Sequence, residues 1–332
     1  MVTDFSKLKK ILVIRLSSLG DVLLTTPLIR TIKKKNPSIQ IDFVVREQFS
    51  DAVQYNPNLN KIYKYSNSKS EKQNLFKFLS LEKYDLVIDL QNNLRSKEIL
   101  RQLQCRALQF KKSNFKKFLL VHFKINRLKD QPQIPLRYAE AAGINELDDD
   151  GLEFFAENSP DVRLNKNENY IGLCPGAKHF TKRWPKDYFI ELGKKLESAH
   201  YKILLFGGPE EVQICDEIMN ALKSAQNLCG TSLLQLVADM KMCKVIYTND
   251  SGLMHIASAV KVPVVAFFGS TVKEFGFYPY KTKSIELEIE NLSCRPCTHI
   301  GRNTCPKIHF KCMKEIKPEL AFNSLNKLVT AE

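Results

Sequence analysis

The chain has 332 residues, which suggests about two domains at roughly 100–200 residues each. Its hydrophobic share of 44% is enough for real cores, and this excludes a disordered protein. No apolar run approaches the ~20 residues that span a bilayer, and the N-terminus does not read as a secretion signal, so we expect a cytoplasmic protein. The net charge of +14 predicts an anionic partner, although a lysine-rich codon bias would have the same effect.

Strand and helix signals alternate along the first half of the chain. In chain order, the pattern predicts a strand at 11–15, a helix at 21–36, strands at 39–45 and 62–65, a helix at 71–81 and a buried strand at 86–90. A polar, turn-rich stretch runs from 148 to about 169. We expect the domain boundary inside this stretch, between residues 160 and 161.

The alternation restarts after the boundary. It predicts strands at 170–174, 202–206, 245–248 and 262–268, and helices at 186–198, 211–224, 233–242, 251–260 and 318–329. Strands that alternate with helices imply parallel sheets covered by helices. We therefore predict an α/β protein of two Rossmann-like, doubly wound domains, residues 1–160 and 161–332, that face a central cleft.

The first candidate site lies where the first strand ends. That strand is followed by Leu16-Ser17-Ser18-Leu19-Gly20-Asp21. Ligands of open α/β sheets bind at the carboxyl ends of such strands. Gly20 would let the backbone approach a ligand closely, and Asp21 is an acid placed where that ligand would sit.

Two loops of the second half carry further signals. Cys174-Pro175-Gly176-Ala177-Lys178-His179-Phe180-Thr181-Lys182-Arg183-Trp184-Pro185 gathers cations that would stabilise a departing phosphate; a solvated surface loop is the alternative. Asn249-Asp250-Ser251-Gly252-Leu253-Met254-His255 opens a helix, whose free N–H groups and dipole make an anion site. Asp250 or Ser251 could instead serve only as a helix cap, and a lone helical His such as His255 is usually structural.

Three other segments have weaker signals. The basic, aromatic stretch 111–129 suits an anionic membrane surface, or is an ordinary solvated helix. Cytoplasmic thiols at this spacing could hold zinc, or form a reduced, cysteine-rich loop; the residues are Cys294, Cys297, Cys305 and Cys312, with His309 nearby. Asp148-Asp149-Asp150 formally matches an Asp-x-Asp metal motif, but its linker position favours a solvated charge run. The chain contains neither a Walker A loop nor a GxGxxG fingerprint.

Taken together, the three strand-end motifs resemble one family, the bacterial lipopolysaccharide heptosyltransferases of glycosyltransferase family 9. The matching residues are Ser18–Leu23 with Thr26-Pro27, Cys174–Ala177 with Lys182–Pro185, and Asn249–Ala257. This resemblance runs from about residue 10 to the C-terminal helix. It implies a GT-B fold, an acceptor-binding first domain, a nucleotide-sugar-binding second domain, and a last helix (about 316–330) that packs back on the first domain.

The resemblance also implies roles for single residues. Asp21 would be the catalytic base, and Lys182 would act in catalysis by contacting the donor phosphates. The expected donor contacts are Ser18, Gly20, Ala177, Lys178, Lys182, Glu211, Asp250, Ser251, Gly252 and His255. Ala177 and Lys178 fall where some members carry hydroxyl residues, and the register of Glu211 against the ribose is open. Expected acceptor contacts are Lys111, Lys112, Lys116 and Lys117, and neither a cofactor nor a metal is expected.

The expected chemistry is inverting transfer. A base removes the acceptor hydroxyl proton while the anomeric carbon becomes oxocarbenium-like, and a carboxylate can do this, especially where partial burial raises its pKa. Lys182 and the helix start at Ser251 could stabilise the leaving nucleotide diphosphate without a metal. We therefore expect transfer of a heptose from ADP-L-glycero-D-manno-heptose to the lipid-linked lipopolysaccharide inner core, with peripheral contact at the cytoplasmic face of the inner membrane.

Other functions would fit parts of the same pattern. A GT-B nucleotide-sugar epimerase would share the architecture, although Gly20-Asp21 argues against it, and a family member could transfer another sugar. A nucleic-acid-binding protein would explain the positive charge. However, no base-stacking aromatics or known module are recognisable among the basic residues, so we expect no nucleic-acid partner.

Overall fold

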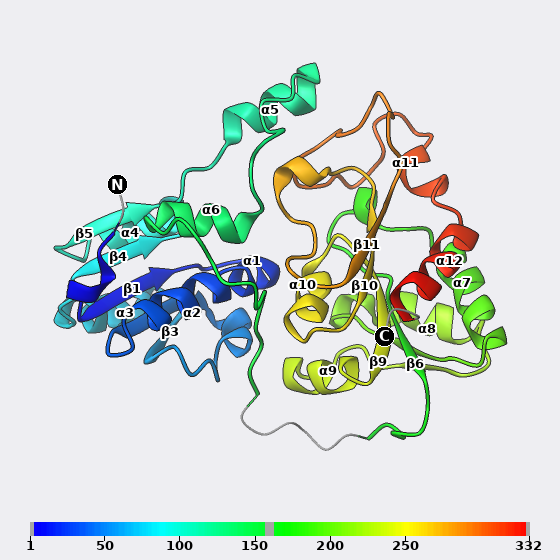
Figure 1. Ribbon diagram of the computed structural model, residues 1–332, viewed down its shortest axis with the longest axis horizontal. Coiled ribbons are helices and arrows are strands. Elements are labelled where there is room, and N and C mark those ends of the chain that lie inside the picture. Colours follow the sequence, from blue (N-terminus) through cyan, green and yellow to red (C-terminus); the bar gives the residue numbers. More distant parts are fainter. Residues whose placement is uncertain (1–2, 157–162, 330–332) are drawn as a thin grey trace. The chain divides into compact units, whose positions relative to one another are not determined.

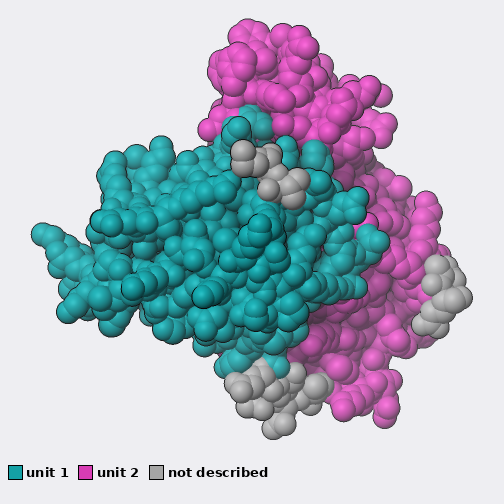
Figure 2. All heavy atoms as spheres, turned by 60° about the vertical axis from the view of Figure 1, so that its left-hand side comes forward, with its two compact units in different colours: residues 1–113, 132–157 teal, residues 114–131, 158–332 magenta. Residues whose placement is uncertain are grey.

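A computed structural model describes residues 3–156 and 163–329, and Figure 1 shows the course of the chain. The chain divides into two compact units, coloured separately in Figure 2. Unit 1 comprises Met1–Ser113 and Pro132–Glu157, and unit 2 comprises Asn114–Gln131 and Asn158–Glu332. The domain boundary expected at 160/161 lies outside the described residues. The segment 114–131 was expected in the first domain, but it belongs to unit 2.

Unit 1 is built on a five-stranded parallel sheet with strand order β3-β2-β1-β4-β5. The strands are β1 (Lys10–Ile14), β2 (Gln40–Arg46), β3 (Lys61–Tyr65), β4 (Leu86–Asp89) and β5 (Arg106–Gln109). The helices are α1 (Leu19–Leu23), α2 (Thr26–Lys35), α3 (Lys69–Leu81), α4 (Leu94–Leu100) and α6 (Ile134–Ala141). The chain order reverses between β1 and β4, and ligands of doubly wound sheets bind at such a switch point.

Unit 2 contains a six-stranded parallel sheet with strand order β11-β10-β9-β6-β7-β8. The strands are β6 (Tyr170–Cys174), β7 (Lys202–Leu205), β8 (Ala225–Asn227), β9 (Cys243–Asn249), β10 (Val264–Phe268) and β11 (Ser284–Glu288). The helices are α5 (Asn114–Phe123), α7 (Lys186–Ser198), α8 (Val212–Met219), α9 (Leu233–Met240), α10 (Gly252–Ala259), α11 (Lys311–Lys314) and α12 (Pro318–Val329). Its switch point lies between β6 and β9.

The predicted α/β class and the two doubly wound halves are confirmed. The differences lie at the sheet edges: β5, β8 and β11 were not predicted, and all three are edge strands. Most of their residues are exposed or half-buried, so they lack the continuous apolar run by which the central strands are recognised. The predicted helix 211–224 is shorter, since α8 spans Val212–Met219.

The predicted helix 21–36 is divided into α1 and α2. Pro27 stands in the first turn of α2 and has no N–H group to donate to the carbonyl of Leu23. The hydroxyl of Thr26 donates to that carbonyl instead, at 2.8 Å, and the hydroxyl of Thr25 donates to Val22 at 2.7 Å. These threonines satisfy the carbonyls at the break, which leaves α1 as a short helix that presents Asp21.

The C-terminal helix α12 lies within unit 2, and its expected packing on the first domain stays a prediction. It contacts α7, β9, β10 and β11. Ala321, Leu325 and Leu328 are buried in the same hydrophobic cluster as Trp184. The apolar face of α12 is therefore already occupied by the core of unit 2.

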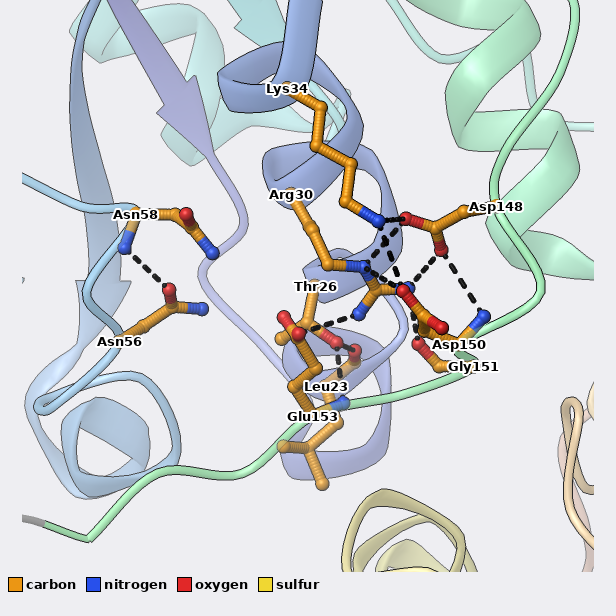
Figure 3. A network of polar contacts seen from close by, with 10 residues as sticks. All are labelled: Leu23, Thr26, Arg30, Lys34, Asn56, Asn58, Asp148, Asp150, Gly151 and Glu153. Atoms are coloured by element: carbon orange, nitrogen blue, oxygen red, sulfur yellow. Dashed lines mark hydrogen bonds and ion pairs between the residues drawn. The ribbon is translucent and has the colours of Figure 1, made fainter. Parts of the chain in front are cut away.

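In the acidic run Asp148–Asp150, Asp149 and Asp150 are exposed, as expected of a solvated charge run, but Asp148 and Asp150 also pair with basic residues of α2 (Figure 3). The buried Arg30 pairs with Asp148, donating from Nε at 2.8 Å, and pairs with Glu153 at 2.8 Å. Lys34 bridges Asp148 and Asp150 at 2.7 and 3.0 Å. This network holds the segment after α6 against α2.

Candidate active site

The loop after β1 holds Asp21 at the switch point of unit 1. Its carboxylate accepts hydrogen bonds from the backbone N–H and the hydroxyl of Ser18, at 3.1 and 2.9 Å. Gly20 is buried directly beside it, and Ser18 is exposed. The side chain is thereby fixed at the first turn of α1, within the crevice where a doubly wound sheet binds its ligand.

Two partners of Asp21 were not apparent from the sequence. Arg15 Nη2 lies 2.6 Å from the carboxylate, and the Tyr138 hydroxyl lies 3.5 Å from it. Burial is the largest single influence on the pKa of Arg15 and lowers it, but the charge and hydrogen bond of Asp21, together with Tyr138 and Asp89, raise the pKa above its ordinary value. The carboxylate therefore sits in an ion pair, whereas the sequence pointed only to partial burial.

Arg15 is held in place from the other side of the switch point. Its Nη1 donates to the carbonyl of Leu90, directly after β4, at 2.6 Å. Gln91 accepts the backbone N–H groups of Leu16 and Ser17 at 2.9 and 3.1 Å. The loops that follow β1 and β4 are thus joined by polar contacts, which orients the Arg15–Asp21 pair.

The four lysines expected to bind the acceptor are divided between the two units. Lys111 and Lys112 belong to unit 1, whereas Lys116 and Lys117 lie on α5 in unit 2. Lys112 is close enough to Arg15 and Asp21 for their charges to act on it; burial, followed by the charge of Arg15, lowers its pKa. Lys117 instead lies over the rings of Phe275 and Phe277, at 5.9 and 6.0 Å.

A buried cation that the sequence did not single out contacts residues on either side of Lys112. Arg137, on α6, lies 5.2 Å from the ring of Phe110, and its Nη2 donates to Ser113 at 3.2 Å. Among the described residues its Nη1 has no hydrogen-bond partner, and burial lowers the pKa of Arg137. Phe110 in turn contacts Tyr138, so this cation belongs to the same part of unit 1 as Asp21.

In unit 2, the loops after β6, β9 and β10 meet at Asp250. Lys182, in the loop after β6, lies 2.7 Å from the Oδ2 atom of Asp250. Thr271, in the loop after β10, donates its hydroxyl to the same oxygen at 2.7 Å. The sequence predicted Lys182 and Asp250 as donor contacts, and the structure joins them in one ion pair; Thr271 was missed.

Asn249 and Trp184 fix the loop that carries Lys182. The side-chain N–H₂ group of Asn249 donates to the carbonyls of Pro175 and Gly176 at 2.8 and 3.2 Å, and its Oδ1 accepts the backbone N–H of Trp184 at 2.9 Å. Trp184 is buried, stacks on Phe267 at 4.2 Å, and donates its indole N–H to Ile316 at 2.8 Å. These contacts hold the loop after β6 against the end of β9.

The remaining predicted donor residues lie around the same strand ends. Ser251 is the N-cap position of α10, but its hydroxyl does not cap the helix; Gly252 begins the helix, and His255 is buried one turn inside it. Glu211 accepts the Gly208 N–H at 2.7 Å, and a Cβ on Gly176 would lie 2.2 Å from the Glu211 side chain. Gly176 therefore leaves room for Glu211 to cross the turn.

Two further predicted donor contacts, Ala177 and Lys178, lie in the same loop as Lys182. Ala177 is buried, and its carbonyl accepts Arg183 Nε at 2.7 Å, while the Lys178 side chain is exposed. Lys182 is therefore the cation of this loop that lies beside Asp250.

In the cysteine-rich segment, Cys294, Cys297 and Cys305 lie close enough to Cys312 for their charges to add to the effect of burial, which raises its pKa. Cys294 Sγ lies 3.8 Å from His309 Nε2. Over residues 3–156 and 163–329, no group of three or more His, Cys, Asp or Glu side chains could hold a metal ion. The segment instead contacts the Lys182 loop: Thr181 and Arg302 exchange hydrogen bonds at 3.1 and 2.9 Å, and Phe180 stacks on Phe310.

Residues 73–308 match the family model described as "Glycosyltransferase family 9 (heptosyltransferase)". Lipooligosaccharide heptosyltransferase 2 of Campylobacter jejuni is 30% identical over 326 residues, which cover 94% of this chain and 96% of the relative. Lipopolysaccharide heptosyltransferase 2 of Salmonella typhimurium is 42% identical over 122 residues, 35% of each chain.

Solved structures show the same fold. The glycosyl transferase family 9 protein of Veillonella parvula has a TM-score of 0.81 and 24% identity, covering 100% of this chain and 99% of its own. ADP-heptose lps heptosyltransferase II of E. coli has a TM-score of 0.76 and 24% identity, covering 97% and 98%. The expected GT-B fold is therefore confirmed.

Proposed function

Because the chain belongs to glycosyltransferase family 9, the heptosyltransferases, we propose that it transfers a heptose from an ADP-heptose to the inner core of lipopolysaccharide. Membership makes the chain a glycosyltransferase. Two ion pairs at the two switch points support the proposal, Arg15–Asp21 in unit 1 and Lys182–Asp250 in unit 2. Of the two, the Lys182–Asp250 pair carries the proposal most directly, because it sets a cation where a nucleotide diphosphate would leave.

On the donor side, Lys182 would neutralise the diphosphate as the glycosidic bond breaks. Asp250 and Thr271 hold the ammonium group, and the start of α10 at Ser251 and Gly252 adds N–H groups with the positive end of a helix dipole. Positive charge placed in advance at the leaving group stabilises the transition state. Glu211 and His255 complete the proposed donor contacts.

On the acceptor side, Asp21 would remove the proton from the attacking hydroxyl. Its carboxylate is oriented by Ser18 and paired with Arg15, so the group is held in one position before the acceptor arrives. Arg15 would also stay paired with the carboxylate while the hydroxyl proton moves. Lys112 and Arg137, in the same unit, would contact the anionic groups of a core oligosaccharide.

We test the donor assignment by calorimetric titration of the purified protein with ADP, GDP, UDP and a DNA duplex. Selective ADP binding, followed by release of ADP on addition of ADP-heptose and a core acceptor, is the expected result. Preference for another nucleotide would keep the enzyme class and replace the donor. Binding of DNA alone would contradict the proposal.

The second part of the proposal is peripheral contact with the cytoplasmic face of the inner membrane, through α5. Within residues 3–156 and 163–329, no helix is long and apolar enough to cross a bilayer. The inner face of α5, Leu120 and Val121, is buried against Phe275. On its outer face Phe115, Phe118 and Phe123 are 72%, 48% and 61% exposed, and the exposed Lys116 lies among them in the chain. Exposed aromatic rings beside lysines suit an anionic lipid surface.

Flotation with lipid vesicles tests this contact. We expect wild-type protein to bind phosphatidylglycerol vesicles, to bind phosphatidylcholine poorly, and to lose binding when Phe115, Phe118 and Phe123 are replaced by Ser. A matched control replaces two exposed apolar residues of α3, Phe78→Ser with Leu81→Ser, and should leave binding unchanged. Equal loss in the control would mean that α5 is not the contact.

A further inference from the structure

Arg295, in the cysteine-rich segment, joins three parts of unit 2. Its side chain is 7% exposed and is paired with Glu288 at the end of β11. It donates to the carbonyl of Gly269 at 2.8 Å and to the carbonyl of Thr271 at 2.8 and 3.2 Å, and its Nη1 donates to Ile289 at 3.1 Å. A guanidinium can satisfy this many acceptors at once, and an ammonium cannot.

The loop that Arg295 holds leads directly to the Lys182–Asp250 pair. Thr271 offers its carbonyl to Arg295 and donates its hydroxyl to Asp250 Oδ2 at 2.7 Å. That same oxygen lies 2.7 Å from Lys182 Nζ. A shift of the loop that moved Thr271 would therefore change the position of the carboxylate and, with it, of the ammonium group.

The backbone around Arg295 is itself held by the helix that carries the exposed aromatic rings. Lys124, directly after α5, donates to the carbonyls of Cys294 and Pro296, at 3.3 and 2.6 Å. These two residues flank Arg295 in the chain. Next to Thr271, Val272 and Phe275 pack in the same cluster as Leu120 and Val121 of α5. Polar and apolar contacts thus join α5 to the loop after β10.

We propose that Arg295 is a positioning residue for the transfer reaction, which sets the Lys182–Asp250 pair through Thr271 and ties that pair to α5 through Lys124. The proposal rests on the donor role assigned to Lys182 above. It gives the cysteine-rich segment a function, because Arg295 joins the loop after β10 to the end of β11.

The test compares Arg295→Lys with Thr271→Val and with the double variant. Arg295→Lys keeps the charge but loses most of the hydrogen bonds, so we expect the dissociation constant for ADP to rise about tenfold, with the KM for the acceptor unchanged. In the Thr271→Val background, the same replacement should add less than about a twofold change, because Arg295 acts through Thr271. Arg163→Lys, an arginine paired with buried Asp239 in the same unit, is the matched control.

Thermal melting separates positioning from folding. Wild-type ADP affinity in a folded Arg295→Lys variant would overturn the inference, and so would an effect that adds fully to that of Thr271→Val. If the wild-type protein prefers GDP or UDP, the same comparison is made with that nucleotide. Failure to bind any nucleotide would overturn the proposed donor site, and this inference with it. The two failures are therefore distinguishable.

Discussion

The two ion pairs at the two switch points have opposite arrangements. In unit 1 the anion is the more exposed partner, because the Asp21 side chain is 18% exposed and Arg15 is 9% exposed. In unit 2 the cation is the more exposed partner, since Lys182 is 17% exposed and Asp250 is 8% exposed. Related architectures thus present groups of opposite sign at corresponding strand ends.

This reversal agrees with the chemistry proposed for each unit. A base must reach the acceptor proton, so its carboxylate is presented, and the buried arginine fixes it in place. A diphosphate needs positive charge, so the ammonium is presented, and a buried carboxylate and a threonine fix it. The more buried residue of each pair therefore positions the more exposed one. Substitution of the exposed residue should have a different effect from substitution of the buried one.

Removing the presented anion should have the largest effect. We expect Asp21→Asn, and likewise Asp21→Ala, to lower kcat by about 10²–10⁴-fold, the usual contribution of a general base. ADP affinity should stay at the wild-type level, because Asp21 lies in the other unit. Steady-state rates together with calorimetry measure both quantities, and a near-wild-type rate would remove Asp21 from the base role.

Removing the presented cation should weaken the donor side instead. For Lys182→Ala we expect ADP affinity to fall about tenfold to a hundredfold, with a matching loss of turnover, because a charge-assisted contact to phosphate is lost. Lys186→Ala removes an exposed lysine nearby in the chain and serves as the control. Unchanged kinetics for Lys182→Ala would assign the phosphate contact to another residue.

Replacing a buried partner tests the reversal itself. Arg15 reaches Asp21 through Nη2 and Leu90 through Nη1, and a lysine has a single nitrogen that does not reproduce this fork. We therefore expect Arg15→Lys to lower kcat by about tenfold without changing ADP affinity. Arg46→Lys, at the end of β2, is the control within unit 1. If Arg15→Lys weakened ADP binding as much as it slowed turnover, the division of labour between the pairs would be wrong.

The ion-pair network around Arg30 in Figure 3 lies away from the switch points. Unlike substitutions in the two ion pairs at the switch points, a substitution in this network should therefore change stability and leave activity unchanged. Arg30 holds the pKa of Asp148 well below its ordinary value of 3.8. Asp148→Asn should therefore lower the free energy of unfolding by about 1–2 kcal/mol at pH 7. The difference should shrink as the pH falls below about 4, because Asp148 then becomes protonated in the unfolded chain while it is still ionised in the folded protein.

Urea denaturation at pH 7 and pH 3 measures this difference. Glu146→Gln, an exposed residue of the same segment, is the control. Loss of turnover per folded molecule in Asp148→Asn would contradict the assignment of this network to stability.

The strand-end loops were predictable because a buried strand is a continuous apolar run in the sequence, and the loop that follows it is short and polar. Asp21, Lys182 and Asp250 were all found in this way. Their partners were not, because they come from distant segments: Tyr138 lies 117 positions from Asp21, and Thr271 lies 21 positions from Asp250. In the sequence, Arg15 is an ordinary polar residue at the end of a predicted strand. Its contacts with Leu90 and Asp21 become apparent only in the folded sheet.

The unit to which α5 belongs was equally hidden. Its amphipathic character was visible in the sequence, but the residues that cover its apolar face, Phe275 and its neighbours, lie about 150 positions later in the chain. A periodic pattern shows that a face is apolar, and it does not identify the partner that covers it. The edge strands were missed for a related reason, since half-exposed strands carry little hydrophobic signal.

The assignment of Asn114–Gln131 to unit 2 bears on protein engineering. The chain passes between the units three times, after Ser113, after Gln131 and after Glu157. A chimaera that exchanged everything after residue 157 for the matching half of a relative would leave α5 facing a foreign surface and would strip Phe275 of its native cover. A compatible donor-half transplant must carry residues 114–131 with it, as an insertion between β5 and α6 of the recipient.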